Sequence, residues 1–153
     1  METSTNKKIP KIDGKKLKIA IILPYFNEEL GLELLANTKE TLLSNNVQEK
    51  NIKITRVSGA LEIPFACQKV IEKYKPNAVI ALGIIIRGQT KHFDLVSENA
   101  YSGIMKVQLE KKVPISFGIL TCENLKQVKD RVSKKELNKG KEFALAALLQ
   151  TTI

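Results

Sequence analysis

The chemically richest stretch of this chain is the segment of residues 83–92, which reads Gly-Ile-Ile-Ile-Arg-Gly-Gln-Thr-Lys-His. It begins at the end of an apolar run that predicts a buried strand, and it leads into a stretch of helical character at residues 93–100. An arginine, a Gly-Gln-Thr turn and the sole histidine of the chain therefore lie at the junction of a strand and a helix. Ligand sites of α/β proteins lie at such junctions, where backbone N–H groups favour anions.

The residue types of the chain restrict the chemistry that it can perform. The sequence has no Walker or GxGxxG phosphate loop, and a single histidine cannot assemble a typical multi-histidine metal site. The two cysteines, Cys67 and Cys122, do not have the spacing of metal ligands. Three options remain: acid–base catalysis by His92, phosphate binding by backbone N–H groups and arginine, and aromatic stacking.

The elements that must position these residues alternate along the chain. Apolar runs predict strands at residues 17–23, 52–57, 78–85 and 113–120, and helical spacing predicts helices at residues 28–43, 62–74, about 91–109, 123–131 and 139–149. This order predicts one α/β domain over residues 17–153, with a four-stranded parallel sheet and helices on both faces. The Lys-rich residues 1–16 are predicted to form a basic N-terminal arm.

Polar and aromatic residues follow the carboxyl end of each predicted strand. Phe26 and Asn27 follow the first strand, residues 59–62 the second, and residues 84–92 the third. The fourth strand is followed by Thr121, Glu123 and Asn124. All four segments are expected at the edge where an open α/β sheet binds its ligands.

Each of these residues also has a purely structural explanation. Glu62 could be a first-turn acid that interacts with the helix dipole, Thr90 an N-cap, and Arg87 a member of a surface ion pair. His92 could be a solvated helix residue, and the aromatic side chains could belong to the core. The joint placement of the segments, rather than any single residue, favours a functional site.

The charge and composition of the chain indicate which classes of partner the protein binds. The formal net charge is +9, mostly from lysine, and the few aromatic residues are not interleaved with basic ones. The charge therefore indicates a solvated surface that attracts anionic substrates, not a nucleic-acid platform. No apolar run could span a membrane, and residues 1–18 lack the apolar core of a secretory signal. With free cysteines, these features predict a cytoplasmic protein without nucleic-acid or membrane partners.

Five motifs occur in order from about Leu17 to the C-terminus: Phe26-Asn27, Gly59-Ala-Leu-Glu-Ile-Pro64, Gly83-Ile-Ile-Ile-Arg-Gly-Gln-Thr-Lys-His-Phe-Asp94, Pro114-Ile-Ser-Phe-Gly-Ile-Leu-Thr121 and Asn138-Lys-Gly140. Their combination resembles the 6,7-dimethyl-8-ribityllumazine synthase family. The resemblance implies a flavodoxin-like three-layer α/β/α fold and the penultimate enzyme of riboflavin biosynthesis. That enzyme condenses 5-amino-6-ribitylaminouracil with 3,4-dihydroxy-2-butanone 4-phosphate, releases phosphate and water, and uses no metal or organic cofactor.

The resemblance also implies a role for each matching residue. Phe26 is expected to stack on the pyrimidine, and His92 to donate and accept protons. The pyrimidine and ribityl chain are expected to contact Ala60, Leu61, Glu62, Ile84, Ile85, Ile86, Phe117 and Lys139. The phosphate of the second substrate is expected to contact Gln89, Thr90 and Arg131. Of these residues, Phe117, Arg131 and Lys139 are expected to reach the site from an adjacent subunit.

The family forms rings of five subunits or hollow shells of twelve such rings, so a homo-oligomer is expected, with riboflavin synthase as a candidate partner. The chain departs from the family pattern at Tyr25, Leu61 and Ile84, where Arg, Phe, and Thr, Cys or Val are usual. These departures predict altered affinity rather than lost function. Two other interpretations compete: a non-catalytic flavin or lumazine carrier, and a basic nucleic-acid-binding shell protein. His92 and Arg131 argue against a carrier, which needs neither a proton shuttle nor a second phosphate site.

Overall fold

The predicted alternation of strands and helices is present throughout residues 9–153, the part of the chain that this computed structural model describes. Residues 1–8, which belong to the predicted basic arm, lie outside the described residues. The strands are β1 (Ile19–Pro24), β2 (Ile52–Val57), β3 (Ala78–Ile86) and β4 (Ile115–Cys122). The α-helices are α1 (Glu28–Ser44), α2 (Ile63–Tyr74), α3 (His92–Lys111), α4 (Leu125–Val132) and α5 (Lys139–Gln150). Two short 3-10 turns, η2 (Glu49–Asn51) and η3 (Ala60–Glu62), precede β2 and α2.

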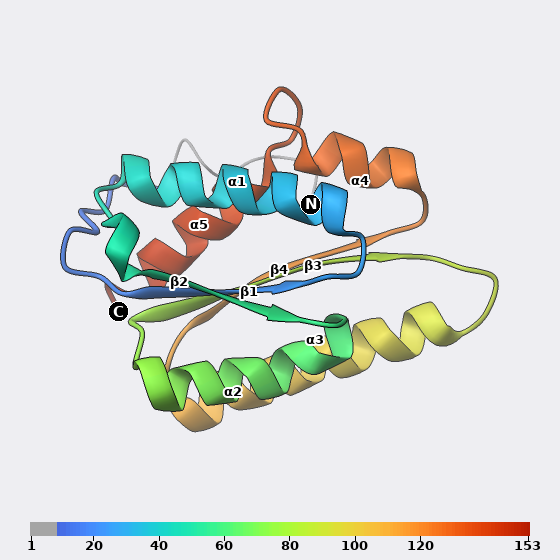
Figure 1. Cartoon of the computed structure of the whole chain (residues 1–153), viewed down its shortest axis with the longest axis horizontal. Coiled ribbons are helices and arrows are strands. Elements are labelled where there is room, and N and C mark those ends of the chain that lie inside the picture. Colours follow the sequence, from blue (N-terminus) through green and yellow to red (C-terminus); the bar gives the residue numbers. More distant parts are fainter. Residues whose placement is uncertain (1–8) are drawn as a thin grey trace.

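The four strands form one parallel sheet in the order β2-β1-β3-β4. Helices α1, α4 and α5 cover one face, and α2 and α3 cover the other, so the fold is the predicted three-layer α/β/α arrangement (Figure 1). The strand order is that of a flavodoxin-like sheet. Strands β1 and β3 lie inside the sheet and are buried along almost their whole length, which explains their continuous apolar sequences.

The helices pack closely where the sequence has small residues. A Cβ atom at position 140 would lie 2.8 Å from the carbonyl oxygen of Leu34 and 2.9 Å from the backbone nitrogen of Thr38. Only glycine therefore allows the start of α5 to approach α1 this closely. On the opposite face of the sheet, Cys67 is buried among apolar side chains, and this burial raises the pKa of its thiol to about 12.

The element boundaries differ from the predictions by up to two residues. The starts of β1 and α4 and the end of α3 each lie two residues later than predicted, and β4 is displaced by two residues at both ends. The prediction placed this strand at residues 113–120, but it spans Ile115–Cys122 and pairs with β3 as far as Ile86↔Cys122. Pro114 lacks an N–H group for the ladder, although its carbonyl accepts a hydrogen bond of 2.9 Å from the backbone of Val79. The carboxyl ends of the strands lie at one edge, on the right in Figure 1, where α1 and α3 begin. Within residues 9–153, no helix is both long and apolar enough to cross a membrane.

Candidate functional site

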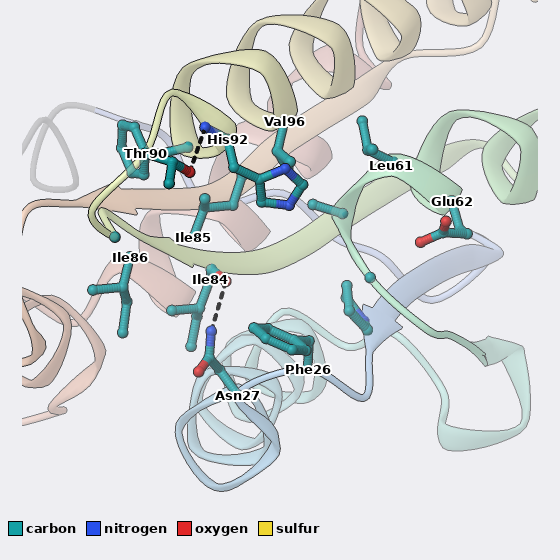
Figure 2. Close-up of a pocket in the computed structure, with 15 residues that line it drawn as sticks. Phe26, Asn27, Leu61, Glu62, Ile84, Ile85, Ile86, Thr90, His92 and Val96 are labelled. Atoms are coloured by element: carbon teal, nitrogen blue, oxygen red, sulfur yellow. Dashed lines mark hydrogen bonds between the residues drawn. The ribbon is translucent and has the colours of Figure 1, made fainter.

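A cleft of about 480 Å³ opens at the carboxyl edge of the sheet, between the ends of β1 and β3. Three segments line it: the turn after β1, the 3-10 turn η3, and the connection from β3 into α3 (Figure 2). The predicted site residues found in its lining are Phe26, Ala60, Leu61, Glu62, Ile84, Ile85, Ile86, Thr90 and His92. Residues that are separated by up to 66 positions in the chain are thus brought together, from residue 26 to residue 92.

The turn after β1 presents an aromatic ring to the cleft. Asn27 adopts a left-handed backbone (φ 59°, ψ 44°), and its side-chain amide donates a hydrogen bond of 3.0 Å to the carbonyl oxygen of Ile84 (Figure 2). The backbone N–H of Phe26 donates to the carbonyl of Ser58 at 3.2 Å. The turn is therefore held on both sides, yet Phe26 is 73% exposed and is not a core residue. Its ring offers a face to a planar ligand.

The turn η3 forms a second wall of the cleft. It begins after Gly59, and the backbone N–H of Glu62 donates to the Gly59 carbonyl at 3.3 Å. The Glu62 side chain is exposed and precedes helix α2, so its carboxylate is available to accept hydrogen bonds from hydroxyl groups. Leu61 is 49% exposed in the same wall. This wall therefore offers one charged acceptor beside an apolar surface.

The connection from β3 into α3 forms the third wall. A Cβ atom at Gly88 would meet nothing within 4 Å, so a ligand can approach the backbone there. The hydroxyl of Thr90 accepts a hydrogen bond of 3.2 Å from the backbone N–H of His92, the first residue of α3. Val96 lies one turn further along α3 and lines the cleft beside His92, as the four-residue spacing requires. Gln89 is exposed in this turn but does not line the cleft.

The fourth predicted segment follows β4 at the same carboxyl edge of the sheet, as expected, but it does not line the cleft. The Glu123 carboxylate instead accepts a hydrogen bond of 2.6 Å from Arg87. The Asn124 side chain caps α4 by accepting from the backbone of Gln127 at 2.9 Å. The ion-pair explanation of Arg87 is thus confirmed, and hydrogen bonds to Asp94 and Glu123 raise the pKa of its guanidinium further above its ordinary value.

The three residues expected from an adjacent subunit do not line the cleft of their own chain. On β4, the ring of Phe117 packs on that of Tyr101, with 5.6 Å between the ring centres. Arg131 is half-buried on α4, and Lys139 at the start of α5 pairs with Glu142 at 2.7 Å. A contribution of these side chains to the cleft of another copy stays a prediction.

Tyr25, where the chain departs from the family pattern, packs against an arginine of β2. The guanidinium of Arg56, from β2, lies 4.0 Å from the centre of the Tyr25 ring. Its Nε donates to the Leu23 carbonyl at 3.0 Å, and one of its terminal nitrogens pairs with Glu28 at 2.8 Å. A positive charge therefore stands beside the turn after β1 although position 25 does not supply it.

The cleft lining also includes Asn27, Gly59 and Gly88, which belong to the segments predicted at this edge but were given no role. It further includes Pro24, Phe93 and Val96, which lie outside those segments. Val96 could have been found from its spacing to His92, and the others adjoin predicted residues in the chain. Among residues 9–153, no group of three or more His, Cys, Asp or Glu side chains is placed to hold a metal ion.

Residues 16–152, nearly the whole chain, match the sequence model of a protein family described as 6,7-dimethyl-8-ribityllumazine synthase. The matched region includes every strand of the sheet and all three segments that line the cleft.

Proposed function

The chain belongs to the 6,7-dimethyl-8-ribityllumazine synthase family, a family of transferase-type enzymes of riboflavin biosynthesis, and from this premise we propose the reaction that it catalyses. It condenses 5-amino-6-ribitylaminouracil with 3,4-dihydroxy-2-butanone 4-phosphate to give 6,7-dimethyl-8-ribityllumazine. The observation that carries the proposal is that one cleft contains an exposed aromatic ring, a carboxylate and the sole histidine, contributed by Phe26, Glu62 and His92.

The reaction needs alignment and proton transfer more than a reactive side chain. The free amine of the pyrimidine attacks the ketone carbon of the second substrate, and loss of water gives an imine. Elimination then releases phosphate and leaves an enol, which tautomerises to a new ketone at the carbon that carried the neighbouring hydroxyl group. Attack of the ribitylamino nitrogen on this ketone closes the ring with loss of a second water. Each step moves protons between nitrogen, carbon and oxygen, and a positioned imidazole can catalyse such transfers as a general acid and base.

Phe26 and the two neighbouring walls hold the pyrimidine substrate. The exposed face of the Phe26 ring stacks on the planar ring, and Leu61 contributes apolar surface opposite the end of β3. Backbone groups of Ala60 and of Ile84, Ile85 and Ile86 bind the ring edge. The Glu62 carboxylate accepts hydrogen bonds from ribityl hydroxyls.

The turn before α3 holds the phosphate-bearing substrate. Its backbone, with open space at Gly88, and the side chains of Gln89 and Thr90 bind the phosphate at the start of a helix of 20 residues. His92 follows directly, so its imidazole is close to the carbon atoms between the phosphate and the pyrimidine. It donates and accepts the protons of the imine and elimination steps.

A second copy of the chain completes the site in a ring of five subunits. Its Arg131 pairs with the phosphate, and its Phe117 and Lys139 close the pyrimidine side. Arginine suits this role because its planar fork matches the geometry of an oxyanion. We place the protein in the cytoplasm, since Cys67 and Cys122 are free, buried thiols of the kind that a reducing compartment maintains.

The direct test is incubation of the purified protein with both substrates while lumazine fluorescence is recorded. The proposal predicts product only when both substrates and the protein are present, at a rate above the spontaneous condensation. Product at the spontaneous rate alone, together with tight binding of added lumazine, would instead support a lumazine carrier. A binding constant for nucleic acid that falls steeply with salt would support the shell-protein alternative.

A further inference from the structure

We propose that Arg87 is a positioning residue that holds residues 88–91 in their phosphate-binding shape by joining Asp94 to Glu123. The inference rests on the function proposed above for that turn. The Arg87 Nε donates a hydrogen bond of 2.6 Å to the Glu123 carboxylate. Its two terminal nitrogens donate to the two carboxylate oxygens of Asp94, at 3.3 Å each. One side chain therefore joins the end of β3, the first turn of α3 and the connection after β4.

Because of the position of Arg87 in the chain, its ion pair with Asp94 connects the two ends of the turn. The turn leaves β3 at Arg87 and enters α3 before Asp94, so the ion pair joins its two ends. The backbone N–H of Arg87 also donates to the Cys122 carbonyl at 2.9 Å, which anchors the first end to β4. The guanidinium lies 4.2 Å from the centre of the Phe93 ring, and Phe93 lines the cleft. Arg87 with its partners Asp94 and Glu123, named the clamp from here on, therefore fixes both ends of the turn and one wall of the site.

The turn itself has little else to fix its shape. Residues 88–91 are all exposed, and Gly88 gives the backbone wide conformational freedom. Within residues 9–153, the Thr90 hydroxyl bonds only to the backbone of His92, and the Lys91 carbonyl accepts a hydrogen bond from the backbone of Leu95 in the same helix. A loop that must become ordered when the ligand binds loses affinity, so a turn held in place beforehand binds phosphate more tightly.

The charges around Arg87 argue that it does not bind the phosphate itself. Three of its five N–H donors are already used by carboxylates. One guanidinium with two carboxylates carries a net charge of about −1 at neutral pH, which disfavours a phosphate at that point. Its contribution to phosphate binding is therefore through the geometry of the turn.

The first test is steady-state kinetics of Arg87→Ala. The clamp predicts that kcat/KM for the phosphate-bearing substrate falls roughly 10- to 100-fold, the range expected when a binding group is displaced by about an ångström. KM for the pyrimidine should change little. Arg87→Lys should recover part of the loss, because an ammonium can pair with one carboxylate but cannot form the fork. The matched control is Lys126→Ala, which removes an exposed ion pair (2.7 Å to Asp130) outside the cleft and should behave as wild type.

The decisive variant is the double substitution Asp94→Ala, Glu123→Ala, which keeps Arg87 but removes both carboxylates that accept its hydrogen bonds. Electrostatics alone predicts tighter phosphate binding, because two negative charges are lost. The clamp predicts the opposite: a loss like that of Arg87→Ala, with no further loss when the three substitutions are combined. Unchanged or tighter use of the phosphate-bearing substrate in the double variant would overturn the proposal and make Arg87 a direct ligand.

A second measurement separates this proposal from the proposed reaction. His92 is the sole histidine, so the NMR signal of ¹³C-labelled histidine reports on one position while inorganic phosphate is added. Arg87→Ala should require roughly tenfold more phosphate than wild type for the same shift, the lower end of the range above. This result in a protein that makes no lumazine would refute the proposed reaction but not the clamp. An unchanged titration and unchanged turnover in Arg87→Ala would refute the clamp alone.

Discussion

The side-chain amide of Asn27 donates a hydrogen bond of 3.0 Å to the carbonyl oxygen of Ile84. This bond joins the turn after β1 to the end of the neighbouring strand, β3. The backbone of Asn27 is left-handed, a conformation that asparagine adopts more readily than most residues. Because Phe26 directly precedes Asn27, the bond fixes the aromatic wall of the cleft relative to the wall formed by β3.

Two substitutions at position 27 separate the hydrogen bond from the backbone conformation. Asn27→Gly keeps the left-handed backbone and loses the bond, so the free energy of unfolding should fall by about 0.5–1.5 kcal/mol. Asn27→Ala should lose about 1 kcal/mol more, because its Cβ is strained in that conformation. Urea unfolding at one protein concentration measures the free energy of unfolding of each variant. KM for the pyrimidine should rise in both variants. An alanine variant as stable as the glycine variant would contradict the role given to the backbone.

His92→Ala should lower kcat on the order of 10- to 1,000-fold, the low-to-middle range for the loss of one acid–base group. The lower end is expected, because an aligned amine and carbonyl condense partly without help. Substrate affinities should change less than kcat. A chelator should leave the wild-type rate unchanged, since the imidazole is proposed to act without a metal. An unchanged turnover number in His92→Ala would contradict the role of His92 as an acid–base catalyst. Inhibition by a chelator that added metal reverses would contradict the metal-free mechanism.

Arg131→Ala should weaken the use of the phosphate-bearing substrate by roughly 1.5–3 kcal/mol, the contribution of a hydrogen bond to a charged group. This corresponds to a decrease of roughly 10- to 150-fold in kcat/KM for that substrate. Pyrimidine binding should stay nearly intact, and Arg131→Lys should restore only part of the loss. Equal weakening for both substrates would show that Arg131 supports the fold of α4 rather than the phosphate.

Mixed assemblies test whether two chains share one site. An inactive variant with Phe26→Ala and His92→Ala and a weakened Arg131→Ala variant are refolded together in equal amounts. In a head-to-tail ring, about one interface in four then combines an intact cleft with an intact Arg131, so activity should recover toward roughly a quarter of wild type. Mixing assembled proteins without refolding is the control. Verified mixed rings without recovery would mean that each site is built within one chain.

Much of the fold could be predicted because its signals are local. The buried strands β1 and β3 are continuous apolar runs, and β2 begins and ends where the alternating pattern predicts. The displacement of β4 by two residues could not be predicted, because its limits follow from its register with β3. The turn η3 has too few residues for a periodic signal, so the start of α2 was predicted one residue early.

In the site, too, local features could be predicted from the sequence, but contacts between distant segments could not. The motifs identified residues on all three walls of the cleft, but not the contacts between the walls. The bond from Asn27 to Ile84 spans 57 positions and that from Arg87 to Glu123 spans 36, and no local pattern encodes such pairs. Glu123 was predicted at the binding edge of the sheet, but its pairing with Arg87 outside the cleft could not be predicted for this reason.

Phosphate release and lumazine formation, measured together in one reaction, test whether this cleft makes 6,7-dimethyl-8-ribityllumazine. We expect one phosphate to be released for each lumazine formed, over many turnovers per chain, and both rates to fall in parallel in His92→Ala. Phosphate released without lumazine, or lumazine formed no faster than in the absence of protein, would contradict the proposed function.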